Sequence, residues 1–134
     1  MASAILLLSA GFASAQGQGH KRVHRLARII EKHASELHEE VDDHFKSSPA
    51  YKHLHRHSRE IEKLARAIHE TTDEGGNKRL RGAVYLLDKE IHHFVEVAED
   101  ARQFTQVPPQ AYAHLRREVR YLHEAVRDMK RELD

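Results

Sequence analysis

The chain has 134 residues, with 22 Lys and Arg against 21 Asp and Glu, and a formal net charge of +1 when histidine is neutral. This length predicts a single domain, and the balanced charge argues against a nucleic-acid partner. The sequence contains no cysteine, which excludes disulfides, thiolate metal sites, iron–sulfur clusters and covalently attached haem. An apolar core must therefore hold the domain together.

The first 15 residues resemble an export signal. MASAILLLSAGFASA carries no charged side chain, and Ala13-Ser14-Ala15 matches the small-x-small pattern of a signal-peptidase site. We expect a signal peptide at residues 1–15, a flexible joint at 16–19, and a secreted or periplasmic mature chain. The apolar run is too short to span a bilayer, so we expect no transmembrane segment. Because no Lys or Arg follows Met1, a buried N-terminal helix is the alternative.

Residues 20–134 have apolar side chains three and four positions apart, which predicts amphipathic helices. The four stripes are Val23, Leu26, Ala27, Ile30, Ala34, Leu37, Val41 and Phe45; Tyr51, Leu54, Ile61, Leu64, Ala65 and Ile68; Leu80, Ala83, Val84, Leu87, Ile91, Phe94, Ala98 and Ala101; and Tyr112, Leu115, Val119, Leu122, Val126, Met129 and Leu133. The first helix is expected over about 20–46. Ser48-Pro49 should begin the second, Gly75-Gly76 should follow it, and Pro108-Pro109 should precede the fourth.

Four such helices with short connections predict an all-α, antiparallel up-down-up-down four-helix bundle. A longer coiled coil formed by two or more chains is the alternative architecture. In the third helix, Leu86, Val97 and Phe104 lie off the main stripe. This surface is either a broad core-facing side or a homodimer face, so we expect self-association through the third helix or an unknown protein partner.

Thirteen histidines are the unusual feature of the composition. In YKHLHRHSRE, residues 51–60, three of them stand at alternate positions. On a helix, His53 and His57 share a face because they are four residues apart, whereas His55 points the other way. The apolar stripe places His57 at the core boundary, His53 on a flank and His55 toward solvent.

The bundle topology predicts a composite metal site at one end. The turns near Ser48 and Pro108 lie at the same end of an up-down bundle, together with Glu40 and Asp43. Zinc and copper(II) accept several imidazoles with a carboxylate or water. The predicted metal ligands are His44, His53, His57 and His114. The competing interpretation of the same residues is a solvated, titratable surface.

No catalytic motif is present: the sequence has no glycine-rich phosphate loop and no His-Glu-x-x-His. We therefore expect a non-enzymatic, exported, histidine-rich bundle that binds Zn or Cu. The alternative is a pH-sensitive structural or interaction module, possibly homodimeric, with no metal. The architecture is similar to that of periplasmic b-type and c′-type cytochromes. However, the chain lacks Cys-x-x-Cys-His, and its first mature helix lacks methionine, so no family is indicated.

Overall fold

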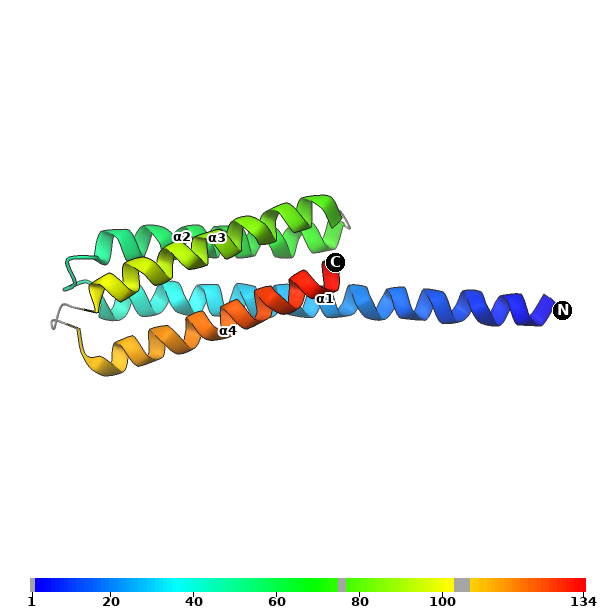
Figure 1. Cartoon of the computed structure of the whole chain (residues 1–134), viewed down its shortest axis with the longest axis horizontal. Helices are drawn as coiled ribbons and strands as arrows, with labels where there is room; N and C mark the ends of the chain where they lie inside the picture. Colours follow the sequence, from blue (N-terminus) through cyan, green and yellow to red (C-terminus); the bar gives the residue numbers. More distant parts are fainter. Residues whose placement is uncertain (1, 75–76, 103–106) are drawn as a thin grey trace.

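The computed structural model describes residues 2–74, 77–102 and 107–134, and these residues form four α-helices (Figure 1). Their bounds are α1 (Ala2–His44), α2 (Tyr51–Glu74), α3 (Asn77–Ala101) and α4 (Pro109–Leu133). The all-α class predicted from the sequence is confirmed.

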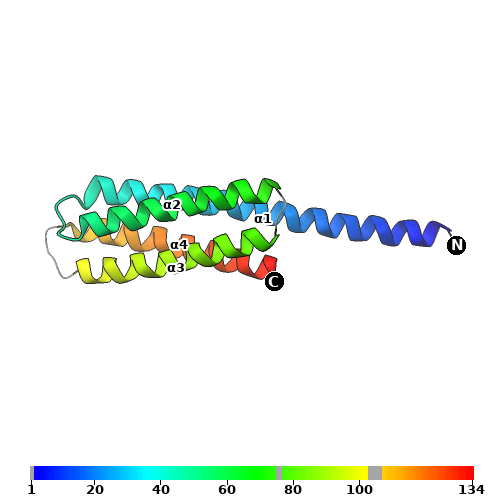
Figure 2. The same ribbon diagram turned by 90° about the horizontal axis from the view of Figure 1, so that it is seen from above.

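The helices form an up-down-up-down bundle within one chain. Helix α1 packs against α2 and α4, α2 packs against α3, and α3 packs against α4, where the contact is the least extensive. Figure 2 shows that each helix runs antiparallel to the next one in the sequence. The expected bundle topology is therefore correct.

The core consists of the predicted apolar stripes. In α1 and the residue that follows it, the fully buried side chains recur at three- and four-residue steps: Ala27, Ile30, Ala34, Leu37, Val41 and Phe45. They pack against similar stripes of the other helices in one continuous cluster. Burying each Leu or Ile side chain contributes about 1.5–3 kcal/mol, so these stripes fix which face of each helix points inward. The flanks of each stripe then lie against the neighbouring helices.

Helix α1 begins earlier than the sequence pattern predicts. It is continuous from Ala2 and includes residues 16–19, which we expected to form a flexible joint. Glycine lowers helix stability by only about 1 kcal/mol per residue, so two glycines do not prevent helical hydrogen bonding there. The N-terminal part of α1 extends beyond the bundle (Figure 1). Cleavage after Ala15 stays a prediction, and no described helix is long and apolar enough to span a membrane.

The connection between α1 and α2 and the start of α4 contain the residues that were predicted there. The Ser48 hydroxyl accepts a hydrogen bond from the backbone N–H of Ala50 at 3.2 Å, and the Ser48 carbonyl accepts one from the N–H of Tyr51. Ser48 thus caps the turn that leads into α2, which starts two residues after the predicted first helical residue, Pro49. Pro109 is the first residue of α4, as its missing N–H and fixed φ favour.

The off-stripe surface of α3 is only partly exposed. Leu86 is 51% exposed, whereas Val97 is half-buried and packs against the core. Phe104 lies outside the described residues. Self-association through α3 therefore stays a prediction.

Candidate metal centre between helices α1 and α2

His57 and His53, the predicted pair on α2, contact different neighbours. His57 donates from Nδ1 to Glu90 Oε2 on α3 at 2.9 Å, and its side chain is 17% exposed, as expected at the core boundary. His53 is exposed, and its Nδ1 lies 3.5 Å from the Arg56 guanidinium. The shared helix face therefore does not bring these two imidazoles to a common point.

His44 and His114 line a common pocket of about 280 Å³ at the end of the bundle. His44 lies 3.9 Å from a Glu40 oxygen, and the Nδ1 of His114 accepts a hydrogen bond from Arg117 at 2.8 Å. Both histidines are exposed. Among the described residues, four groups of three potential ligands have their ligand atoms within 4.8 Å of one another, and none of these groups includes any of the four predicted ligands.

His55, which we expected to point toward solvent, contacts α1 instead. Its side chain is 32% exposed, and Nδ1 donates to Asp42 Oδ1 at 2.7 Å. The expectation was wrong because a helical wheel gives only the angle from the apolar stripe. It does not say which flank a neighbouring helix covers, and here α1 covers the flank that carries His55.

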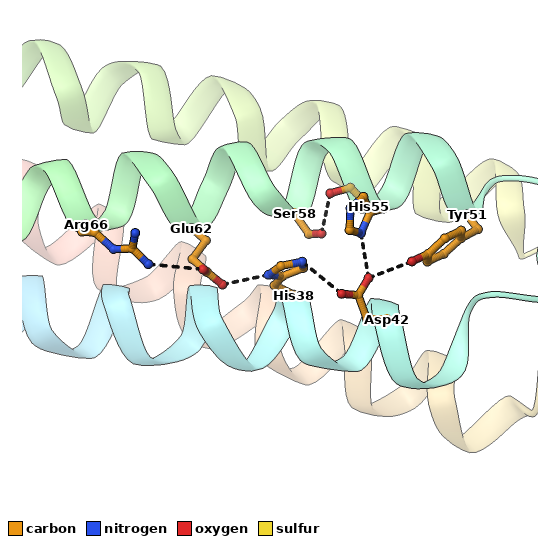
Figure 3. Close-up of polar contacts among 7 residues, drawn as sticks. All are labelled: His38, Asp42, Tyr51, His55, Ser58, Glu62 and Arg66. Carbon is orange, nitrogen blue, oxygen red and sulfur yellow. Dashed lines mark hydrogen bonds and ion pairs between the residues drawn. The ribbon is translucent and has the colours of Figure 1, made fainter.

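His38 and Asp42 of α1 join His55 of α2 in one compact cluster (Figure 3). The i,i+4 spacing places His38 and Asp42 on the same face of α1, with His38 Nε2 3.2 Å from Asp42 Oδ2. The centroids of the two imidazole rings are 5.4 Å apart. Tyr51, at the start of α2, donates its hydroxyl to Asp42 Oδ1 at 3.0 Å.

The two ring nitrogens of His38 differ, because one makes a hydrogen bond and the other has only an ion-pair contact. Its Nδ1 lies 2.9 Å from Glu62 Oε2, and Nδ1 carries a proton because an ionised carboxylate only accepts. Its Nε2 is buried and makes no hydrogen bond, but it lies 3.2 Å from Asp42 Oδ2, within ion-pair distance (Figure 3). A buried polar atom without a partner costs about 1–3 kcal/mol. Two species would satisfy this nitrogen: a second proton or a metal ion.

Glu62 fixes the orientation of the His38 ring through Nδ1, the nitrogen that does not face Asp42. A metal-ligating histidine commonly donates its other ring N–H to a carboxylate, which fixes the tautomer and the ring orientation. Glu62 takes that position relative to His38 and itself accepts a 3.5 Å hydrogen bond from Arg66 (Figure 3). The chain from Arg66 through Glu62 to His38 thus holds Nε2 toward Asp42.

The electrostatics of the cluster keep Asp42 ionised. Burial acts to raise the pKa of Asp42, but the hydrogen bonds from His55 and Tyr51 and the charges of protonated His38 and His55 outweigh it. The pKa of Asp42 therefore lies below its ordinary value. At neutral pH the cluster offers a carboxylate, the form that binds a cation.

The spacing of the three side chains fits a tetrahedral ion. With metal–nitrogen and metal–oxygen bonds of about 2.0–2.2 Å, neighbouring ligand atoms lie roughly 3.4 Å apart, and two imidazole centroids lie about 5 Å apart. The corresponding separations here are 3.2 Å between His38 Nε2 and Asp42 Oδ2 and 5.4 Å between the rings. The 2.7 Å between His55 Nδ1 and Asp42 Oδ1 is shorter than this spacing, so an ion would fit only after these two side chains move apart.

Three further groups of potential ligands occur among the described residues: His24, His69 and Asp73; His33, Glu36 and Glu118; and Asp88, His92 and His123. The group around Asp88 already contains a cation, because Lys130 Nζ donates to Asp88 Oδ2 at 2.7 Å. Its carboxylate is therefore less available to a metal.

The group around Glu36 contains one imidazole and two carboxyls. Burial, a hydrogen bond to Glu118 and the charge of Glu118 raise the pKa of Glu36, and the charges of His33 and Lys32 offset this only in part. His33 Nδ1 donates to Glu118 at 2.7 Å. The cluster of His38, Asp42 and His55 is the better metal candidate because it combines two imidazoles, an ionised carboxylate and a buried nitrogen that makes no hydrogen bond.

The sequence prediction missed this cluster because it assigned faces relative to the core alone. A usable signal was present: His38 and Asp42 form an i,i+4 pair near the end of α1, and His55 follows Asp42 by 13 residues across a short turn. No protein-family model, curated protein or solved structure matches this chain. Its function is therefore inferred from these side chains and their geometry.

Proposed function

We propose that this protein is an exported, non-enzymatic helical bundle that binds Zn²⁺ or Cu²⁺ through His38, Asp42 and His55. The observation that carries the proposal is the buried Nε2 of His38, which makes no hydrogen bond and lies 3.2 Å from the Asp42 carboxylate. This nitrogen faces a carboxylate on one side, while Glu62 holds the ring from the other. Coordination would satisfy Nε2 and neutralise part of the negative charge around it.

The chemistry of the ligand set favours a borderline divalent ion. Two imidazoles and one carboxylate suit zinc, which takes a fourth ligand to complete a tetrahedron, and they also suit copper(II). Magnesium and calcium prefer sets made wholly of oxygen. The side chains of the cluster are half-buried, so a water molecule has access to the fourth position.

Isothermal titration calorimetry of the full chain with ZnCl₂ and with CuSO₄ at pH 7 tests the proposal. We expect saturable binding tighter than tens of micromolar, the affinity range of loose surface histidines. His38→Gln should weaken the tightest binding step by about 100-fold or more, since loss of a supporting partner alone costs roughly 10–100-fold. His53→Gln is the matched control, because His53 is exposed and outside the cluster.

The same titration separates the α1–α2 cluster from the bundle end predicted from the sequence. If His53→Gln or His114→Gln abolishes binding while His38→Gln leaves it unchanged, the metal lies at the bundle end and the present assignment is wrong. If the parent protein shows no saturable binding, the metal-binding function itself is wrong.

A second candidate function is a pH-sensitive structural or interaction module. It is favoured by imidazole–carboxylate pairs between every pair of packed helices. Besides the α1–α2 pairs, these are His33 with Glu118, His57 with Glu90, and His123 with Asp88. This function predicts that mass or helicity changes between pH 7.5 and 5.5 in the presence of EDTA. Unchanged sedimentation and circular dichroism over that range would exclude it.

A further inference from the structure

Helices α1 and α2 contain the same sequence framework. Residues 24–42 read HRLARIIEKHASELHEEVD, and residues 55–73 read HRHSREIEKLARAIHETTD. Both match His-Arg-x-x-Arg-x-Ile-Glu-Lys-x-Ala-x-x-x-His-Glu-x-x-Asp without a gap. The shared positions include polar residues that an apolar stripe does not require, so the pattern is more specific than an amphipathic helix needs.

The repeat is also a structural one. The positions in the two segments that face the core correspond one to one and are all buried: Ala27 with Ser58, Ile30 with Ile61, Ala34 with Ala65, Leu37 with Ile68, and Val41 with Thr72. Equivalent residues therefore have the same rotation about the two helix axes. The flanks that carry the repeated histidine, glutamate and aspartate residues are consequently equivalent as well.

Because α1 and α2 are antiparallel neighbours (Figure 2), two equivalent helices face each other across an approximate two-fold axis. Each contact between them should then occur twice. His38 donates to Glu62, and the equivalent His69 donates to Glu31.

The contact to the aspartate is also duplicated between equivalent residues, although through different ring nitrogens. His55 Nδ1 lies 2.7 Å from Asp42 Oδ1, and the other ring nitrogen of the equivalent His24, Nε2, lies 3.1 Å from Asp73 Oδ1. The clusters thus agree in both the imidazole–glutamate and the imidazole–aspartate contact.

We infer that His24, His69 and Asp73 form a second divalent-metal site, equivalent to the first and placed toward the opposite end of the α1–α2 pair. This inference rests on the proposed function. The ring centroids of His24 and His69 are 5.1 Å apart, close to the roughly 5 Å of two imidazoles on one tetrahedral ion. His69 uses Nδ1 for Glu31, which leaves its Nε2 lone pair for a metal.

The second site is more open than the first. Asp73 is 62% exposed against 34% for Asp42, and Glu31 is 36% exposed against 23% for Glu62. Greater access of water weakens the attraction between a carboxylate and a cation. We therefore expect two binding steps, the weaker one belonging to His24, His69 and Asp73.

Native mass spectrometry of the full chain with ZnCl₂, combined with calorimetry, tests the inference. We expect the parent protein to bind two zinc ions per chain, each of the single variants His69→Gln and His38→Gln to bind one, and the double variant to bind none. His69→Gln should remove the weaker step and His38→Gln the tighter one. Glu31→Gln should weaken only the weaker step, by about 10–100-fold. Circular dichroism of each variant confirms that the bundle is folded, and His53→Gln serves as the control with two ions.

The possible results separate the inference from the proposed function. One zinc ion in the parent protein that is lost in His38→Gln and kept in His69→Gln would overturn the second site and leave the first intact. Two ions that both persist in His69→Gln would also overturn it, since the second ion would then lie elsewhere. No bound zinc in the parent protein would contradict both sites.

Discussion

Replacing Asp42 by Asn is the most informative single change, because Asp42 joins the two histidines of the proposed site. Its carboxylate accepts hydrogen bonds from His55 at 2.7 Å and Tyr51 at 3.0 Å and faces His38 Nε2 at 3.2 Å. An asparagine side chain has nearly the same shape and keeps one acceptor oxygen. The substitution therefore removes the charge and leaves the packing nearly unchanged.

The effect on the metal-free protein follows from the shifted pKa. The pKa of Asp42 is lower in the folded protein than in the unfolded chain, so ionised Asp42 stabilises the fold above its unfolded pKa near 3.8. That contribution is lost as the pH falls through the folded-state pKa. Hydrogen bonds to charged groups contribute about 1.5–3 kcal/mol when buried. Solvent screening at a side chain that is one-third exposed reduces this to about 1 kcal/mol.

We expect Asp42→Asn to lower the melting temperature by about 4 °C at pH 7 and to have a smaller effect at pH 3, below the unfolded pKa near 3.8. Zinc at 100 times its dissociation constant should stabilise the parent protein by about 2.7 kcal/mol per site. The Asp42→Asn variant should lose the part of this zinc-dependent stabilisation that comes from the site of His38, Asp42 and His55. Thermal melts followed by circular dichroism at both pH values, with zinc or EDTA, measure these effects. Asp43→Asn, at the exposed adjacent carboxylate, is the control, and equal behaviour of the two variants would refute the role of Asp42.

Three further predictions concern the core, the turn region and proton competition. Leu37→Ala, at a fully buried position, should lower the free energy of unfolding by about 2–5 kcal/mol, whereas Leu86→Ala should change it by no more than about 0.5 kcal/mol. Urea denaturation measures both free energies, and similar losses in the two variants would contradict the assigned core. Burial raises the pKa of Tyr112, and its hydroxyl donates to the Ala101 carbonyl at 2.5 Å. The neutral side chain therefore stabilises the fold below the unfolded pKa near 10, and this stabilisation is lost at higher pH. Tyr112→Phe should therefore cost about 1 kcal/mol at pH 7 and reduce the loss of stability between pH 9 and 11, and an unchanged alkaline profile in urea titrations would refute this. Zinc affinity should fall between pH 7.5 and 5.5 because protons compete for imidazole nitrogens, and calorimetry showing equal affinity at both pH values would argue against histidine ligands.

The sequence predicts the bundle well because each apolar stripe determines which side of its helix is buried. The stripe of α1, for example, matches the buried residues from Ala27 to Phe45. Short connections then determine that sequential helices are antiparallel. The start of α1 was not predicted, because residues 16–19 show no apolar periodicity and helical hydrogen bonds continue through glycine at modest cost.

His44 and His53, two of the predicted ligands, differ from Asp42 and His55 in their rotation about the helix axes. His44 follows Asp42 by two residues and His53 precedes His55 by two residues, so in an antiparallel pair they lie near the same level along the bundle. However, two residues along a helix turn the side chain by about 200°. This rotation carries His44 and His53 out to solvent, whereas Asp42 and His55 meet between α1 and α2.

The histidine partners across helices depend on which flank of each stripe a neighbour covers. A single stripe does not contain that information, but the repeated framework in residues 24–42 and 55–73 does. Two segments with identical polar positions on antiparallel neighbours predict reciprocal contacts, as His38 with Glu62 and His69 with Glu31 show. A search for internal repeats would therefore have pointed to these residues before the faces of individual helices were assigned.

Anomalous diffraction at the zinc absorption edge, from crystals of the full chain grown with ZnCl₂, tests the central claim most directly. We predict an anomalous peak within about 2.0–2.2 Å of His38 Nε2 and of an Asp42 carboxylate oxygen, with a His55 nitrogen as the third protein ligand. A peak between His44 and His114, or zinc bound only at the surface with His38 Nε2 still uncoordinated, would contradict the proposed site.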